Sequence, residues 1–391
     1  MSILRAVRGC VLVLLCGVLL VLAVLLVLPD EAPSELSVHL HEKGRLDVGA
    51  PSEGFFYWMG LAAEQGEDPE ALGRQRVEHY QQYLQSLQAG SLEYAEPEFM
   101  SMALVPLNGC SLASNACVTE LLNDKPQLDG LIAQAALIFK RYQRLMALEG
   151  HRNPLEPGVE EPMPPFGHLK QGNLALRLQV LKSISIGQAE QGVAQLLIDI
   201  STLRKRLAEE NTLPGKAVYA RLAAADIALL MTLQGQGLLG ELPELQAISS
   251  EEKSLIKPLA REYVIFEHVI APLPEDPHLL SMDIAIPGML RRLLFKKQRT
   301  LNQMADLTNA VLADEGAPNR ARTEPAHAIE DWLDLLVNPL GSQLAELAAP
   351  DVERIQRALS DLEEQIEQFN QHQLQSINRV DAVTIFEGEI Q

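Results

Sequence analysis

The chain has 391 residues, and its 32 Lys and Arg against 52 Asp and Glu give it a formal net charge of −20. A surface this acidic repels phosphate backbones, which excludes nucleic acid as a general partner. Aromatic residues make up only 5% of the chain, and its richness in Leu, Ala, Gln and Glu favours helices over sheets. We therefore expect an all-α protein.

The first predicted element is a single N-terminal transmembrane helix at residues 9–28, which contain no charge, amide or proline. At ~1.5 Å per residue, a helix of this length covers the ~30 Å hydrocarbon core of a bilayer. Arg5 and Arg8 lie in the preceding segment, residues 1–8, and a positive flank stays in the cytoplasm, so everything after the helix is expected outside. The alternative is a cleaved signal peptide, but no small-x-small cleavage site precedes Pro29.

Residues 29–54 are polar, contain three prolines and show no helical period, so we predict a tether. Four consecutive aromatic residues then follow in a chain that has few of them: Phe55, Phe56, Tyr57 and Trp58. They either open the first core helix or form an interfacial belt that contacts the membrane or a partner. We favour the core, because exposed aromatic side chains are costly in a soluble domain, and we keep the four as candidate interaction residues.

A first helical lobe is predicted over residues 55–150. One helix is expected from Pro69 to a stop at Gly90, because apolar residues recur there every three or four positions. A second helix with the same kind of periodicity is expected from Pro126 to a stop at Gly150.

Cys110 and Cys117 lie between these two helices. On one helix their Cα atoms would be ~10 Å apart, beyond the ~7 Å limit for a bridge, so a bond requires a loop. The Asn, Gly and Ser residues around them favour such a loop. We predict a structural disulfide and no metal site, because two cysteines alone do not complete a zinc site.

A proline-rich connection at residues 151–167 is predicted to separate this lobe from a second one at 168–348. The second lobe opens ambiguously at 169–186, where apolar residues fit both a strand and a helix, and the scarcity of β-branched residues favours the helix. An antiparallel helical hairpin follows, which turns at Pro214-Gly215.

At this hairpin and at Asn338-Pro339-Leu340-Gly341, the chain resembles a family of proteobacterial inner-membrane-anchored proteins with no assigned activity. The resemblance covers most of the outward part, rests on no catalytic motif and implies no activity. It favours a bacterial source and nothing more. From this and the orientation predicted from Arg5 and Arg8, we expect a bacterial inner membrane protein with its C-terminal domain in the periplasm.

The helix expected at 289–312 begins with the one dense basic cluster in the chain, formed by Arg291, Arg292, Lys296, Lys297 and Arg299. Such a cluster contacts anionic lipid headgroups or an acidic partner in some proteins, and in others it is a solvated helix face paired with carboxylates. We favour the solvated face, and we keep the cluster as a second candidate interaction surface.

Residues 349–391 are expected to form an amphipathic helix and a tail. Apolar residues from Val352 to Phe369 occupy heptad a and d positions, but fewer than three heptads favour packing on the chain's own helices, with a homodimer as the second option. The final residues are expected to form an edge strand or a frayed tail.

We assign no catalytic, cofactor-binding or metal-binding residues. The chain lacks the motifs of zinc proteases, α/β-hydrolases, P-loops and dinucleotide folds, and the Ser-x-x-Lys at Ser254–Lys257 lacks its partner motifs. We therefore expect a membrane-tethered periplasmic scaffold or assembly module that binds a protein of the cell envelope, rather than an enzyme. The alternatives are a hydrolase-type envelope enzyme whose site assembles only in three dimensions, and a binder of lipids or small ligands.

Overall fold

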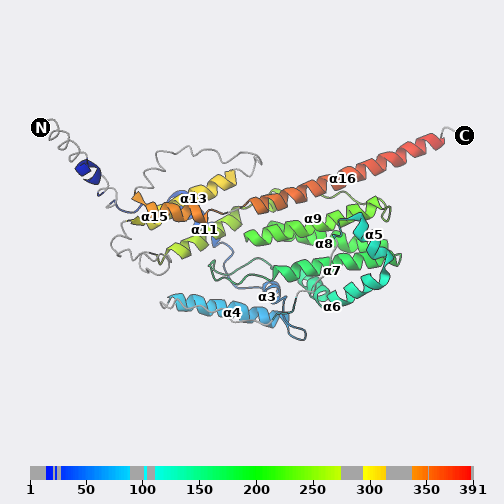
Figure 1. The fold of residues 1–391 in the computed structure, drawn as a ribbon, viewed down its shortest axis with the longest axis horizontal. Coiled ribbons are helices and arrows are strands. Elements are labelled where there is room, and N and C mark those ends of the chain that lie inside the picture. Colours follow the sequence, from blue (N-terminus) through cyan, green and yellow to red (C-terminus); the bar gives the residue numbers. More distant parts are fainter. Residues whose placement is uncertain are drawn as a thin grey trace, which may run out of the picture. The chain divides into compact units, whose positions relative to one another are not determined.

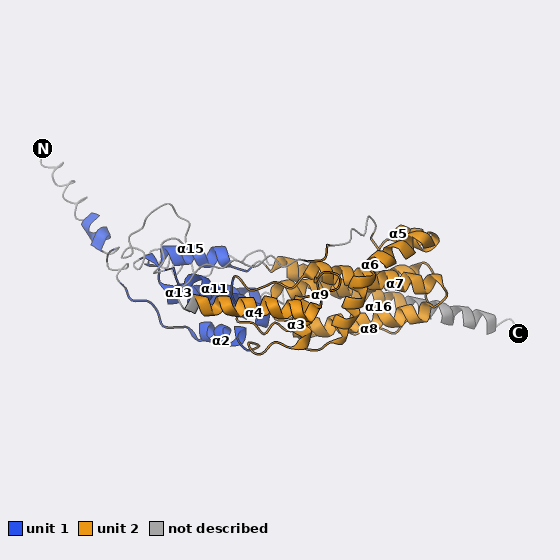
Figure 2. Ribbon diagram, turned by 90° about the horizontal axis from the view of Figure 1, so that it is seen from below, with its two compact units in different colours: residues 1–46, 157–159, 256–351 blue, residues 47–156, 160–255, 352–391 orange. Residues whose placement is uncertain are grey.

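The computed structural model of the chain describes residues 15–20, 23, 28–88, 101–103, 111–273, 294–313, 337–350 and 352–388. These residues form helices and no strands, so the all-α prediction is confirmed for them. They divide into two compact units, and each unit combines separate stretches of the chain, whereas our predicted lobes followed the chain in order (Figure 2). Unit 1 takes residues 1–46, 157–159 and 256–351, and unit 2 takes 47–156, 160–255 and 352–391.

Unit 2 is a helical bundle. Four long helices form its centre, and each packs on the next: α6 on α7, α7 on α8, and α8 on α9 (Figure 1). Helix α16 packs along α9, and α3 packs on α4. The bounds of its helices are α3 Glu53–Met59, α4 Pro69–Gln88, α5 Asn115–Asn123, α6 Lys125–Ala147, α7 Phe166–Ser185, α8 Ala189–Glu209, α9 Leu213–Gly235, α10 Ser250–Lys253 and α16 Glu353–Gly388.

The predicted hairpin is formed by α8 and α9. Helix α9 begins at Leu213 because the Thr212 side chain accepts a hydrogen bond from the backbone N–H of Gly215 (3.2 Å), with a proline in the first turn. The ambiguous segment is the helix α7. Its buried residues include the successive pair Ala175 and Leu176, so the strand-like alternation reflects a helix that is buried on more than one side.

Unit 1 consists of α2 (Glu35–Gly44), α11 (Ile256–Ile270), α13 (Lys297–Ala313) and α15 (Pro339–Ala348). Helix α2 packs on α11 and α13, and α13 also packs on α11 and α15. Gly44 permits the close approach of α2 to α11, because a Cβ atom there would lie 2.2 Å from the Ala260 carbonyl oxygen. The core of the unit includes Leu40, Tyr263, Val264, Phe266, Leu301 and Met304.

The structure differs from two of our expectations about irregular segments. Helix α2 lies within the predicted tether: Ser34 caps it by accepting a bond from the Ser37 N–H (3.1 Å), and Leu40 is fully buried. Its sequence shows little periodicity because the other positions it buries are the small residues Ser37 and Gly44. At the other end of the chain, α16 continues to Gly388, where we expected a strand or a tail.

The predicted membrane anchor at residues 9–28 falls mostly outside the described residues. In the described part of the chain, α9 is the one helix long and apolar enough to cross a membrane, and 67% of its apolar window is buried inside the protein. Such burial is typical of a core helix. The described residues therefore give no support to an N-terminal span, which stays a prediction.

Candidate functional site

The four aromatic residues proposed as an interaction site all lie on α3. Phe55 and Trp58 are buried, with 0% and 1% of their surface exposed, and Phe56 and Tyr57 are half-buried. The Arg74 guanidinium lies 4.2 Å from the centre of the Phe56 ring. This placement fits the core interpretation, and it leaves only Phe56 and Tyr57 with surface for another contact.

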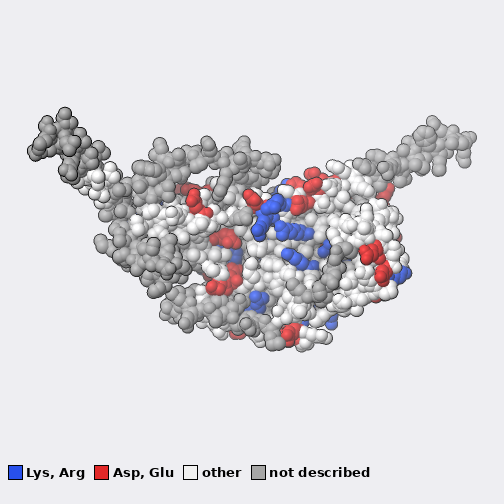
Figure 3. All heavy atoms as spheres, viewed as in Figure 1, with Lys and Arg blue, Asp and Glu red and all other residues white. Residues whose placement is uncertain are grey.

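The predicted basic cluster is described only in part. Arg291 and Arg292 lie outside the described residues, Lys296 is buried, and Lys297 is half-buried. Arg299 forms an ion pair with Glu31 (3.3 Å). The face drawn in Figure 3 likewise shows Lys and Arg side chains close to Asp and Glu side chains rather than an unbroken basic surface.

The predicted disulfide is not tested, because Cys110 lies outside the described residues. Cys117 is buried on α5, a short helix in a segment for which we expected no helix. The disulfide therefore stays a prediction.

A buried polar cluster in the middle of unit 2 was missed by the sequence reasoning. Asp199 on α8 accepts hydrogen bonds from the Tyr142 hydroxyl on α6 (2.7 Å) and from Asn173 Nδ2 on α7 (3.1 Å). The same Asn173 nitrogen lies 3.0 and 3.1 Å from the two carboxylate oxygens of Asp226 on α9. Arg177 on α7 places its Nε 3.5 Å from Asp226 Oδ1. Four successive helices thus contribute to one cluster.

This cluster is closed to solvent, since Asp199 is 6% exposed and Asp226 and Asn173 are 0% exposed. Burial raises the pKa of Asp226 well above its usual range, the neighbouring charge of Asp199 raises it further, and Arg177 opposes the rise. Burial also raises the pKa of Asp199. Both carboxyl groups contact the same Asn173 amide nitrogen, and the charge of each disfavours ionisation of the other.

Paired carboxyl groups that share a proton are the chemistry of acid-base catalysis, but that chemistry needs a substrate within reach of the oxygens. The burial of both aspartates keeps substrate away, so the cluster acts as a polar link between helices. Among the described residues, no three His, Cys, Asp or Glu side chains come together in a way that would hold a metal ion. A sequence signal did exist: Asp226 is the only acidic residue of α9, a largely apolar helix whose other charged residues are Lys216 and Arg221.

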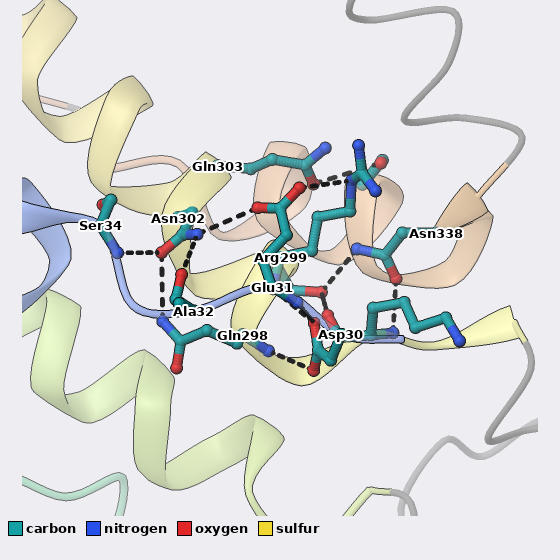
Figure 4. Close-up of polar contacts among 12 residues, drawn as sticks. Asp30, Glu31, Ala32, Ser34, Gln298, Arg299, Asn302, Gln303 and Asn338 are labelled. Atoms are coloured by element: carbon teal, nitrogen blue, oxygen red, sulfur yellow. Dashed lines mark hydrogen bonds and ion pairs between the residues drawn. The ribbon is translucent and has the colours of Figure 1, made fainter. Parts of the chain in front are cut away.

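A second polar cluster, in unit 1, joins residues 30–34 to the start of α13 (Figure 4). The two carboxylate oxygens of Asp30 accept hydrogen bonds from the backbone N–H groups of Gln298 (2.8 Å) and Arg299 (3.0 Å). The first N–H groups of a helix have no partner within the helix, and the positive end of the helix dipole favours a carboxylate there. Asp30 is therefore a cap for α13, contributed from a distant part of the chain.

Asn302, one turn further along α13, forms hydrogen bonds with the same segment, residues 30–34. Its Oδ1 accepts from the Ser34 N–H, and its Nδ2 donates to the Ala32 carbonyl and to the Glu31 carboxylate, all at 3.0 Å. We call the contacts of Asp30, Glu31 and Ser34 with Arg299 and Asn302 the clamp.

The start of α13 is also held by Asn338, the residue before α15. Its Oδ1 accepts from the Lys296 N–H (2.7 Å), and its Nδ2 donates to the Thr300 hydroxyl (2.9 Å). Asn338 is fully buried, and a Cβ atom on Gly341 would lie 1.9 Å from the Thr300 Oγ1. The Asn-Pro-Leu-Gly sequence noted above thus fixes α15 on α13.

No family model, curated protein or solved structure matches the chain. Its function is therefore inferred from the contacts within the chain itself. Of the residues proposed from sequence that the structure describes, Lys296, through its backbone N–H, and Arg299 take part in polar contacts between distant segments.

Proposed function

We propose that this protein is a membrane-anchored helical scaffold of the bacterial cell envelope, which holds a protein partner beside the inner membrane. The clamp carries this proposal. Leu28 ends the apolar run, and Asp30, two positions later, caps α13. An anchor joined to a folded unit in this way presents that unit at a fixed height above the bilayer, which suits a scaffold better than a flexible tether does.

The buried carboxyl pair favours binding over catalysis. Asp199 and Asp226 both have a raised pKa and bind the same Asn173 amide, and their oxygens lie inside the bundle, where they link helices. A hydrolase-type enzyme and a lipid or small-ligand binder are the alternatives, and each needs a site that solvent or ligand can enter.

The proposal is tested in two steps in cells that produce the full chain. Protease added to spheroplasts should degrade the helical domain, and the N-terminal fragment should stay in the membrane pellet after alkaline extraction. A photo-crosslinking residue is then placed at Ile198, which is 67% exposed on α8, and at Ile186, which is 54% exposed after α7. Adducts with an envelope protein are expected at one or both positions.

The matched control places the same photo-crosslinking residue at Asp129, a 53% exposed position of α6 that pairs with Lys182 in the folded bundle. Adducts of equal yield at all three positions would show random collisions and contradict a specific partner. A domain that resists protease in spheroplasts would contradict the periplasmic location.

A further inference from the structure

The distance between the apolar run and the clamp limits how far unit 1 can lie from the bilayer. Leu28, the last apolar residue, is 39% exposed and is two residues from Asp30. A fully extended chain spans at most ~3.6 Å per residue, so the Cα atoms of Leu28 and Asp30 are at most ~7 Å apart. If residues 9–28 span the membrane, Asp30 is within ~7 Å of the hydrocarbon boundary.

The headgroup layer is about as thick as this maximum distance of ~7 Å between Leu28 and Asp30. A bilayer measures ~40–45 Å in all, with a hydrocarbon core of ~30 Å, which leaves ~5–8 Å of headgroups on each side. The Asp30 carboxylate is bonded directly to the backbone of Gln298 and Arg299, at 2.8 and 3.0 Å. The first turn of α13 therefore cannot lie far above the headgroups.

We propose that the first turn of α13 lies in the lipid headgroup layer, so that unit 1 contacts the membrane surface beside its anchor. This inference rests on the proposed anchoring by residues 9–28. The partner that this turn contacts is the headgroup layer of the membrane that holds the anchor.

The charged side chains at this turn are of both signs: the Asp30 carboxylate binds the backbone N–H groups of α13, and the Glu31 carboxylate pairs with Arg299. Lys297 is half-buried and carries its ammonium on a flexible stem, which reaches lipid phosphates from the interface. The chain as a whole has a net charge of −20, so general attraction to an anionic bilayer does not bring unit 1 there. The short covalent link and the clamp hold the turn in place, and Lys297 supplies a local cation where phosphates are densest.

The test measures the depth of residue 297 in the full-length protein. A genetically encoded fluorescent amino acid replaces Lys297, and the protein is reconstituted into phosphatidylcholine and phosphatidylglycerol vesicles that carry a nitroxide either on the headgroup or at the end of the acyl chain. Stronger quenching by the headgroup nitroxide is expected. Stronger quenching by the acyl-chain nitroxide, or no quenching by either, would overturn the contact.

The clamp is tested in the same assay. Asp30→Ala combined with Asn302→Ala should reduce the headgroup quenching at least twofold, whereas Glu35→Ala, which removes a charge at the start of α2 outside the clamp, should leave it unchanged. Circular dichroism checks that the variants stay helical. If they do not, the depth measurement on the protein with an intact clamp still tests the contact. Failure of the protein to float with vesicles would overturn the anchoring itself, while flotation without headgroup quenching would overturn only this contact.

Discussion

The buried aspartates of unit 2 show how single residues couple this bundle to pH. A carboxyl whose pKa is raised by folding binds its proton more tightly in the folded state than in the unfolded chain. The stability it contributes is therefore fully present below the ordinary carboxyl pKa of about 4 and is lost as pH rises through the raised value. Both Asp199 and Asp226 are shifted in this direction, because burial disfavours their charged forms.

Two other buried groups, His151 and Glu210, also make the stability of the fold depend on pH. Burial and the charge of Arg206 lower the pKa of His151 to about 3, so its contribution is lost as pH falls below about 6.5. Burial raises the pKa of Glu210 to about 7, so its contribution is lost as pH rises from about 4.5 toward 7. A variant must therefore be compared with the unchanged protein at each pH.

Asp199→Asn is expected to flatten the loss of stability that occurs as pH rises above the ordinary carboxyl pKa of about 4. The amide keeps the size of the side chain and can donate a hydrogen bond toward Asp226, but it cannot ionise. Urea unfolding of the detergent-solubilised protein from pH 5 to pH 9 measures the free energy of unfolding. We expect this free energy to fall less steeply with rising pH in the variant than in the unchanged protein. Asp129→Asn, at an exposed ion pair on α6, is the control and should leave the slope unchanged. Parallel curves for Asp199→Asn and the unchanged protein would contradict a raised pKa of Asp199.

At the scale of elements, glycines set how closely helices approach. A Cβ atom on Gly73 of α4 would lie 1.8 Å from the Phe56 carbonyl oxygen of α3, and one on Gly60 would lie 1.8 Å from the Pro69 carbonyl oxygen. Backbone groups do not yield as side chains do, so α3 and α4 must separate to admit a methyl group. Gly130 on α6 has nothing within 4 Å of the same position.

Gly73→Ala is expected to destabilise unit 2 by about 1–3 kcal/mol, as overpacking does in other cores. Gly130→Ala removes the same glycine from an open helix surface and should stabilise the protein by about 0.5–1 kcal/mol, because Ala has the higher helix propensity. Thermal unfolding followed by circular dichroism compares the two. A Gly73→Ala variant as stable as Gly130→Ala would show that the contact between α3 and α4 is not tight.

The helices themselves were the most predictable elements. The predicted helices that begin at Pro69 and Pro126 correspond to α4 and α6, because capping residues and apolar spacing are local signals. Helix α2 was not predicted, because Leu40, Ser37 and Gly44 reveal their burial only when α11 is in place. The clamp was missed for the same reason, since it joins Asp30 to residues 268 positions away or more.

At the scale of the whole molecule, the compartment determines the state of the cysteines. If the helical domain faces an oxidising periplasm, Cys110 and Cys117 are expected to form a disulfide. The denatured, unreduced protein should then bind two maleimide groups, at Cys10 and Cys16, and the reduced protein should bind four, as counted by mass spectrometry. Four adducts without reductant would contradict the disulfide, and Cys117→Ser is expected to cost about 2–3 kcal/mol of stability if the bond exists.

The sequence by itself determined the helical class, the positions of most long helices and the acidic surface, because these depend on composition and on the spacing of neighbouring residues. It also supplies the apolar run on which the membrane proposal depends. Only the tertiary structure decided that Asp199 and Asp226 bind the same Asn173 amide inside the bundle and that Asp30 caps α13. These contacts join residues far apart in the chain, and a hydrogen bond between distant segments leaves no periodic trace in the sequence.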